Sequence, residues 1–172
     1  MRRGQFWYGD FLVAVLILMI IGMLFVTSIR DITSRNEVLK ELILEASDIS
    51  SGLMTEGYGT QENWNNGIGT IGLITGYKLD YNKLINFLEL RDYNQQRVML
   101  GTLNNVWIYL QRRDGTIADS NKDKINDALG YTINSVSDIN AKNLVHIKRF
   151  VFYDEDEDGK GDIYTLGVVV WQ

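Results

Sequence analysis

An uninterrupted apolar stretch near the N-terminus constrains this chain more than any other feature. Residues 11–29 read FLVAVLILMIIGMLFVTSI and contain no charged side chain. At a rise of about 1.5 Å per residue, a helix of this length spans about 28 Å, close to the roughly 30 Å hydrocarbon core of a bilayer. A single segment in lipid satisfies its backbone hydrogen bonds only as a helix. The sequence therefore predicts one transmembrane helix, with the lipid bilayer as a partner.

The residues that flank this stretch set the expected orientation. Arg2 and Arg3 precede it, so the positive-inside rule places the N-terminus in the cytoplasm. We expect a protein of the cell membrane whose C-terminal domain is extracellular. An ordinary secretory signal peptide has a shorter apolar stretch and a small-residue cleavage site. Residues 30–33 read RDIT, which is a poor cleavage site, so we expect the segment to be retained.

The junction before the apolar stretch carries a resemblance to a known family. It reads MRRGQFWYGDF, with a basic pair, a Gly-Gln step and an acid at the expected membrane edge. This pattern resembles the class III signal peptide of archaeal type IV pilin-like proteins. The resemblance implies a leader peptide of residues 1–4, cut by a leader peptidase between Gly4 and Gln5. In that family the acid is usually the fifth mature residue, whereas here Gly9 is fifth and Asp10 is sixth.

Asp10 also has a physical interpretation of its own. A carboxylate at the edge of the hydrocarbon is costly unless it is paired. In a surface filament, Asp10 would pair with the new amino group of a neighbouring subunit. The alternative is an interfacial carboxylate that reaches headgroup water. The first interpretation makes like or related pilin subunits the expected partners.

An amphipathic stripe continues beyond the apolar stretch. Its apolar members recur at intervals of three and four, with one gap around residues 34–37. We expect one helix from Phe6 to about Ser51, with Gly52 as its stop. The alternative is a separate helix after a break near Ser34. The expected organisation is a helix over residues 5–53 and a head domain over 54–172. The stripe consists of Ile29, Ile32, Leu39, Leu42, Ile43, Ala46, Ile49 and Leu53.

The head domain combines helical and strand patterns, so we expect an α+β fold. Asp80 and Asp92 are N-cap residues for helices over 81–90 and 93–100, and Gly101 ends the second. Strands are expected over 70–75 and 105–111, the latter followed by a turn at 113–116. Residues 144–153 and 163–171 predict an antiparallel hairpin, and 121–133 predict irregular or weakly helical structure. The fold class is thus a long N-terminal helix packed on a small, mainly antiparallel sheet with short helices.

The segment from 57 to 110 carries a second, looser resemblance. Its pattern is similar to the head region of archaeal pilin-like membrane proteins. The matching residues are Ile71-Gly72-Leu73, Lys83-Leu84 and Leu100-Gly101, together with the closing strand Val168–Trp171. Trp64 lies in the Gly- and Asn-rich loop of residues 55–69. We interpret Trp64 as a ring that pins the loop to the core, the alternative being a ligand-stacking residue.

Charge and composition exclude several functions. Without Arg2, Arg3 and Asp10, the chain has 15 basic and 21 acidic residues, so it lacks the cationic surface that binds nucleic acid. The chain has no cysteine for a nucleophile or a thiolate metal site. His146 is the only histidine and has no nearby Ser or Cys partner in the sequence. With no phosphate-binding loop or nucleophile elbow either, we expect a protein that is not an enzyme.

The acidic run between the last two predicted strands is the strongest chemical motif. Asp154, Asp156 and Asp158 match positions 1, 3 and 5 of a calcium loop, and Gly159 matches position 6. Lys160 would offer its carbonyl and Asp162 would stand at position 9, but Thr165 replaces the bidentate Glu of position 12. We expect a weak Ca²⁺ site. The alternative is a solvated hairpin tip that discourages edge pairing.

Two functions are expected, the first from the family resemblance and the second from the membrane span and head domain alone. The first is a type IV pilin-like surface subunit, inserted by its helix and assembled through helix packing, with a head for contact or adhesion. The second is a membrane-tethered extracellular binding module that does not polymerise. The state of the N-terminus distinguishes them, because only the first requires cleavage before Gln5.

Overall fold

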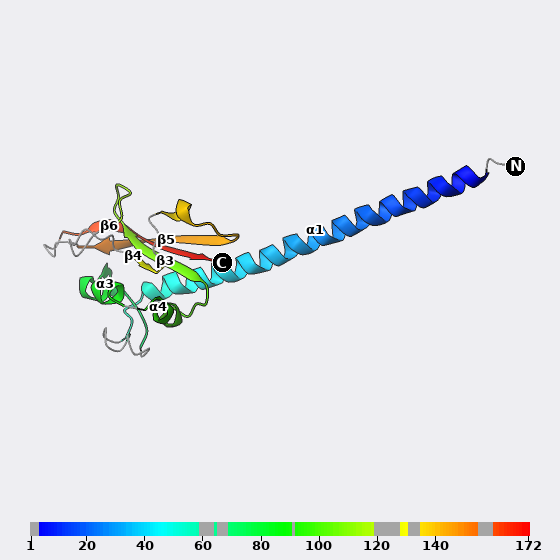
Figure 1. Cartoon of the computed structure of the whole chain (residues 1–172). Coiled ribbons are helices and arrows are strands. Elements are labelled where there is room, and N and C mark those ends of the chain that lie inside the picture. The colour runs from blue at the N-terminus through cyan, green and yellow to red at the C-terminus, as the bar shows by residue number, and fades with distance from the viewer. Residues whose placement is uncertain are drawn as a thin grey trace. The chain divides into compact units, whose positions relative to one another are not determined.

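The computed structural model describes residues 4–58, 64, 69–90, 92–118, 128–130, 135–154 and 160–172. A long N-terminal helix, α1 (Gly4–Leu53), is followed by small antiparallel sheets and short helices (Figure 1). This confirms the predicted α+β fold class. The chain divides into two compact units, Met1–Lys40 and Glu41–Gln172. We describe each by itself and call the second unit the head.

Helix α1 is longer than the sequence pattern predicts. It begins at Gly4 and ends at Leu53, so Gly52 lies in its last turn rather than stopping it. Ser34 is also helical, so the expected alternative of a break near that residue is wrong. The helix continues through the predicted gap in the stripe, where Arg35, Asn36 and Glu37 are exposed and polar side chains are tolerated.

Within the head, one face of α1 is buried. Leu42, Ala46, Ile49 and Leu53 are each at most 4% exposed, and their spacing of four, three and four residues places them on one side of the helix. Ser50 is also buried on this side and accepts a hydrogen bond from Arg149 Nε at 3.3 Å. These four members of the predicted stripe are the packing face of the helix in the head, whereas Ile43, also predicted in the stripe, is 47% exposed.

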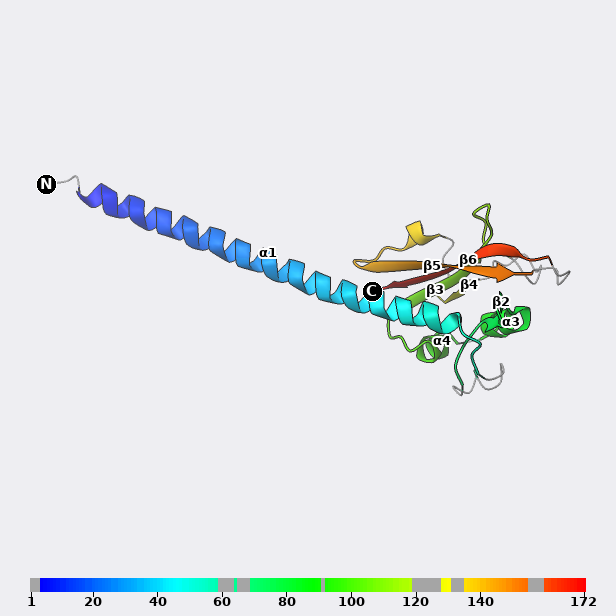
Figure 2. The same ribbon diagram turned by 180° about the vertical axis from the view of Figure 1, so that it is seen from behind.

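The main sheet of the head has the strand order β4-β3-β6-β5, and all of its neighbours are antiparallel. Its strands are β3 (Asn105–Gln111), β4 (Ala128–Gly130), β5 (Leu144–Tyr153) and β6 (Asp162–Trp171). β5 and β6 form the predicted hairpin, with Tyr153 opposite Asp162 at the end that the connecting loop closes. Figure 2 shows the same strands from behind.

The register of the sheet assigns its two faces. Arg149 lies opposite Leu166, which in turn lies opposite Leu110. Because Arg149 contacts Ser50, this face of the sheet looks toward α1. Alternate residues on the same face are almost fully buried. They are Val106, Ile108, Val168 and Val170.

The other face of the sheet carries a second apolar cluster. Trp107, Tyr109, Val169 and Trp171 are buried there, under the 3₁₀ turn η1 (Val136–Asp138) and its neighbours Ile139 and Ala141. Gly167 lies opposite Tyr109, and a Cβ at this glycine would collide with the tyrosine ring. The glycine thus makes room for a ring that lies flat across the sheet.

Two short helices and a small hairpin complete the head. Asp80 caps α3 (Tyr81–Leu88) by accepting from the Lys83 amide at 3.2 Å. Asp92 caps α4 (Tyr93–Met99) by accepting from the Asn94 amide at 3.0 Å. Gly101 has a φ of +71° after α4, as expected for a helix stop. Both caps predicted from sequence are confirmed.

Two strand predictions need correction. The strand expected over 70–75 is reduced to β1 (Ile74–Thr75), which pairs with β2 (Lys78–Leu79), and an isolated bridge at Thr70. Gly72 packs against the backbone of Gly57 too closely for a Cβ, so this segment lies against another loop instead of a strand. Residues 128–130 form β4, where irregular or helical structure was expected.

Candidate functional site

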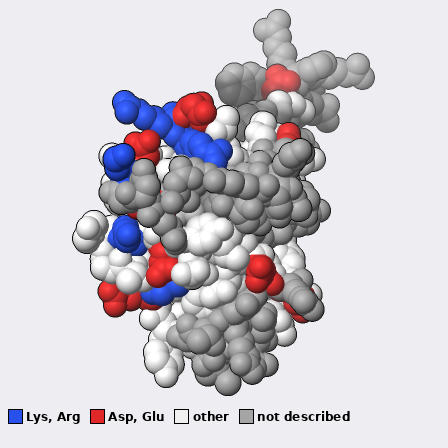
Figure 3. Space-filling view, turned by 90° about the vertical axis from the view of Figure 1, so that its left-hand side faces the viewer, with Lys and Arg blue, Asp and Glu red and all other residues white. Residues whose placement is uncertain are grey.

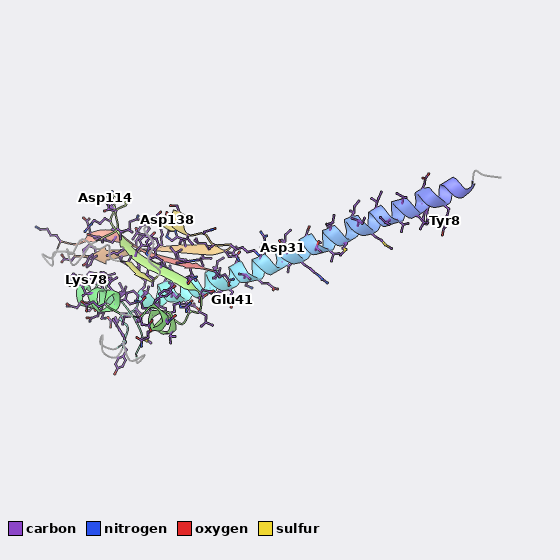
Figure 4. All side chains as sticks on the ribbon, viewed as in Figure 1. Tyr8, Asp31, Glu41, Lys78, Asp114 and Asp138 are labelled. Carbon is purple, nitrogen blue, oxygen red and sulfur yellow. The ribbon has the colours of Figure 1, made fainter. Side chains whose placement is uncertain are left out.

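The first candidate site is the apolar part of α1. Its helix is long and apolar enough to cross a membrane, with a mean hydropathy of 2.9 over its best 18 residues and none of that window buried. Side chains stand out along it from Tyr8 onward (Figure 4). By the same criterion it is compatible with a signal sequence or with a core helix. Length and composition alone therefore make it a candidate membrane span.

The predicted processing residues lie at the start of this helix. Gly4 and Gln5 belong to the first turn of α1, and Asp10 follows in the second. The Asp10 side chain is exposed.

The acidic hairpin is the second candidate site, and only part of it lies in the described residues. Asp154 is 7% exposed, whereas Lys160 and Asp162 are exposed. Asp156 and Asp158 lie outside the described residues. Within the described part of the chain, no three His, Asp or Glu side chains converge as a metal site. The predicted calcium ligands are thus placed only at the two ends of their loop.

Asp154 lines a small cavity together with the start of α3. The cavity measures about 180 Å³ and includes Thr75, Lys78 and Asp80 in its lining. Burial alone would raise the pKa of Asp80. Hydrogen bonds from the Thr75 hydroxyl and from the Lys83 and Asn82 amides outweigh it, so the pKa is lower than usual. These hydrogen bonds thus favour the carboxylate form of the Asp80 cap, and the cavity lining combines Asp80 and Asp154 with Lys78.

His146 lies on the sheet face opposite to α1. Its Nε2 is 2.9 Å from the Tyr109 hydroxyl, within hydrogen-bond distance. Partial burial, and secondarily the nearby Lys148, lower the pKa of His146 below its usual value. Burial also raises the pKa of Tyr109. Among the described residues, no nucleophilic side chain lies between Tyr109 and His146. The two side chains form a polar contact across the sheet.

Trp64 lies where the structural interpretation expects it. Its side chain is 2% exposed, and its Nε1 donates to the Tyr58 carbonyl at 3.2 Å. A ring this deeply buried offers no stacking surface to a ligand.

A groove in the head was not predicted from the sequence. It has a volume of about 390 Å³ and lies between the exposed side of α1 and the segment that follows α4. We call it the acidic groove. It is lined by Glu41, Leu44, Glu45, Asp48, Ile49, Leu100, Gly101, Leu103 and Asn104.

The walls of the acidic groove are held in place by hydrogen bonds. Asn104 Nδ2 donates to Glu45 and so links the two walls. Arg97 donates to the Leu103 carbonyl at 2.9 Å and stacks over the Tyr93 ring. Leu103 nevertheless leaves 89% of its side chain exposed, and Leu44 leaves 57%. The groove thus combines carboxylates, of which Glu45 is hydrogen-bonded, with apolar side chains that face solvent.

The charge of the acidic groove differs from that of another face of the head. Figure 3 shows one face on which Lys and Arg stand beside Asp and Glu. The described residues that line the groove include three acids and no base. Its sequence signal is weak, because its two walls are more than 50 residues apart in the chain.

Comparisons with known proteins give no relative for this chain. No family model, no curated protein and no solved structure matches it.

Proposed function

We propose that this chain is a type IV pilin-like surface subunit, with a structural rather than an enzymatic role. It is inserted in the cell membrane by residues 11–29, and it assembles with like or related subunits through α1. The extracellular head provides contact or adhesion. The observation that carries the proposal is the single helix α1, which is apolar and unburied in its first half and amphipathic in its second.

Two further features support this function. Within the head, the last part of α1 is buried on one face, so the head folds around the end of the same helix that carries the apolar stretch. The leader-like junction, with Gly4 and Gln5 in front of Asp10, then supplies a cleavage point that leaves the stem on the mature protein.

The N-terminus of the native protein tests the proposal. Mass spectrometry should find Gln5 as the first residue. Gly4→Val should block processing, because a bulky residue replaces the small one before the cut, and should leave Met1-Arg2-Arg3 on the chain. Gly22→Val, at a glycine with nothing near its Cβ position, is the matched control and should be processed normally. An intact start on the wild-type protein would contradict the proposal.

One observation favours the alternative, a membrane-tethered binding module that does not polymerise. The acid of the junction is Asp10, one position later than in the usual family pattern. A tether needs no pairing between Asp10 and a neighbouring amino group, so this shift would have no consequence for it.

We also propose that the loop between β5 and β6 binds Ca²⁺ weakly. Asp154, Asp156, Asp158 and Asp162 would supply carboxylate oxygens, and Lys160 would supply its carbonyl. What supports this is the alternation of the acids and the repulsion between them, which a hard cation relieves. Extracellular Ca²⁺ modules function with dissociation constants of about 10⁻⁴ to 10⁻³ M.

A further inference from the structure

The acidic groove is built to receive a cationic, partly apolar side of another molecule. Glu41, Glu45 and Asp48 follow one another at intervals of four and three residues, so they line one side of α1. Leu44 and Leu103 expose apolar surface between and beside them. A fully hydrated cation would leave these leucines in water, whereas a basic and apolar helix face would cover both kinds of surface.

Such a face exists in the same chain. Ile32, Arg35 and Leu39 are spaced three and four residues apart, which places them on one side of α1. Ile32 and Leu39 are 60% and 38% exposed. Arg35 forms an exposed ion pair with Asp31 at 3.1 Å, and such pairs contribute about 0–1 kcal/mol. Arg35 can therefore leave Asp31 for a carboxylate of another molecule at little cost in free energy.

We propose that the acidic groove of one copy receives the Ile32, Arg35 and Leu39 face of a second copy. Arg35 then lies among the groove carboxylates, close to Glu45, and the two apolar side chains cover Leu44 and Leu103. The inference rests on the proposed function, in which copies stand side by side with parallel helices. Two observations favour a second copy as the occupant. Arg35 is opposite in charge to the groove carboxylates, and charged and apolar side chains alternate at intervals of three and four residues on both surfaces.

The contact joins two different positions of the chain, Arg35 of one copy and Glu45 of the next. The contact is also head-to-tail, because each copy offers its own groove to the next one, and such contacts propagate into an open assembly.

Cysteine cross-linking of the full-length chain tests this proposal, because the protein contains no cysteine of its own. A variant with both Arg35→Cys and Glu45→Cys, oxidised in its native membranes or filaments, should give a ladder of dimers, trimers and larger species. A bond within one chain is not possible, since disulfides require Cα atoms within about 7 Å. A ladder beyond the dimer also excludes a closed two-fold pair.

Matched variants keep the result interpretable. Arg35→Cys combined with Asp114→Cys, an exposed acid in a turn, should stay largely monomeric. In a separate test, Arg35→Glu should reduce higher species at least several-fold, and Arg35→Lys should preserve most of them. Thermal melting of Glu45→Cys alone checks that loss of the Asn104 contact leaves the head folded.

Failure of the inference and failure of the proposed function give different results. If filaments containing the chain are seen by electron microscopy but the Arg35 and Glu45 positions do not cross-link, the groove contact is wrong and the filament function stands. If no filaments and no cross-links form at all, both are wrong. If Glu45→Cys cross-links to a different protein and not to a second copy, the groove has another occupant and the inference is wrong.

Discussion

At the scale of single residues, His146 is the group whose titration should be visible near neutral pH. Its pKa is lower in the folded head than the usual 6.5, because burial disfavours the charged ring. The unfolded chain therefore binds the proton more readily. The free energy of unfolding contributed by His146 is fully present above pH 6.5 and falls as the pH drops through the lower, folded pKa.

The variant His146→Gln tests this pH dependence. It removes the titration and keeps a polar group near the Tyr109 hydroxyl. We expect the urea midpoint of the wild-type head to fall between about pH 7.5 and pH 5.5, and that of the variant to fall less. Lys148→Gln is a second measurement, and it should reduce the wild-type slope, since Lys148 also disfavours the charged ring. Equal slopes for wild type and His146→Gln would contradict the assignment.

At the scale of elements, the β5–β6 hairpin is where calcium should act. If its acidic loop binds with a dissociation constant of about 10⁻⁴ to 10⁻³ M, then about 5 mM Ca²⁺ should stabilise the folded state by about 1–2 kcal/mol. This corresponds to a rise of a few degrees in the melting midpoint. Asp162→Asn, which removes one exposed ligand, should reduce the rise, whereas Asp114→Asn in the β3 turn should not. A wild-type midpoint that does not move with Ca²⁺ would reject the site.

The elements differ in how far local sequence determines them. The caps Asp80 and Asp92 and the stop at Gly101 are local interactions, so the bounds of α3 and α4 follow closely from the sequence. β4 is different, because its three residues become a strand only by pairing with Trp107–Tyr109. No alternating pattern marks it in the sequence. β1 is likewise shorter than the strand predicted over 70–75, because only Ile74 and Thr75 pair with β2.

The candidate sites divide in the same way. The apolar stretch and the acidic loop are contiguous in sequence, and both were predicted by residue number. The acidic groove joins Glu45 of α1 to Asn104 after α4, and their contact depends on the tertiary fold. The stripe Leu42, Ala46, Ile49 and Leu53 predicts which side of α1 is buried, and therefore that Glu41 and Asp48 face outward. It does not predict that Leu103 stands opposite them.

At the scale of the whole molecule, the two compact units should partition differently between water and lipid. The unit Met1–Lys40 contains the apolar stretch, whereas Glu41–Gln172 has its own buried core on both faces of the sheet. The full chain should therefore sediment with membranes and require detergent, and residues 41–172 alone should remain in the aqueous fraction. The circular dichroism spectrum of the shorter chain should report a folded sheet.

Charged substitutions distinguish a membrane span from a merely sticky helix. Leu18→Lys together with Ile21→Lys adds about 5–7 kcal/mol to the cost of insertion, since each Lys near the centre of a span costs about 2.5–3.5 kcal/mol. This approaches the whole favourable contribution of a nineteen-residue apolar stretch at about 0.3–0.6 kcal/mol per large apolar residue. The double variant should move into the aqueous fraction. Tyr77→Lys with Val98→Lys, at exposed apolar positions of the head, adds the same charge and should stay with the membrane. If both double variants partition alike, adsorption through the head holds the protein at the membrane, and residues 11–29 do not span it.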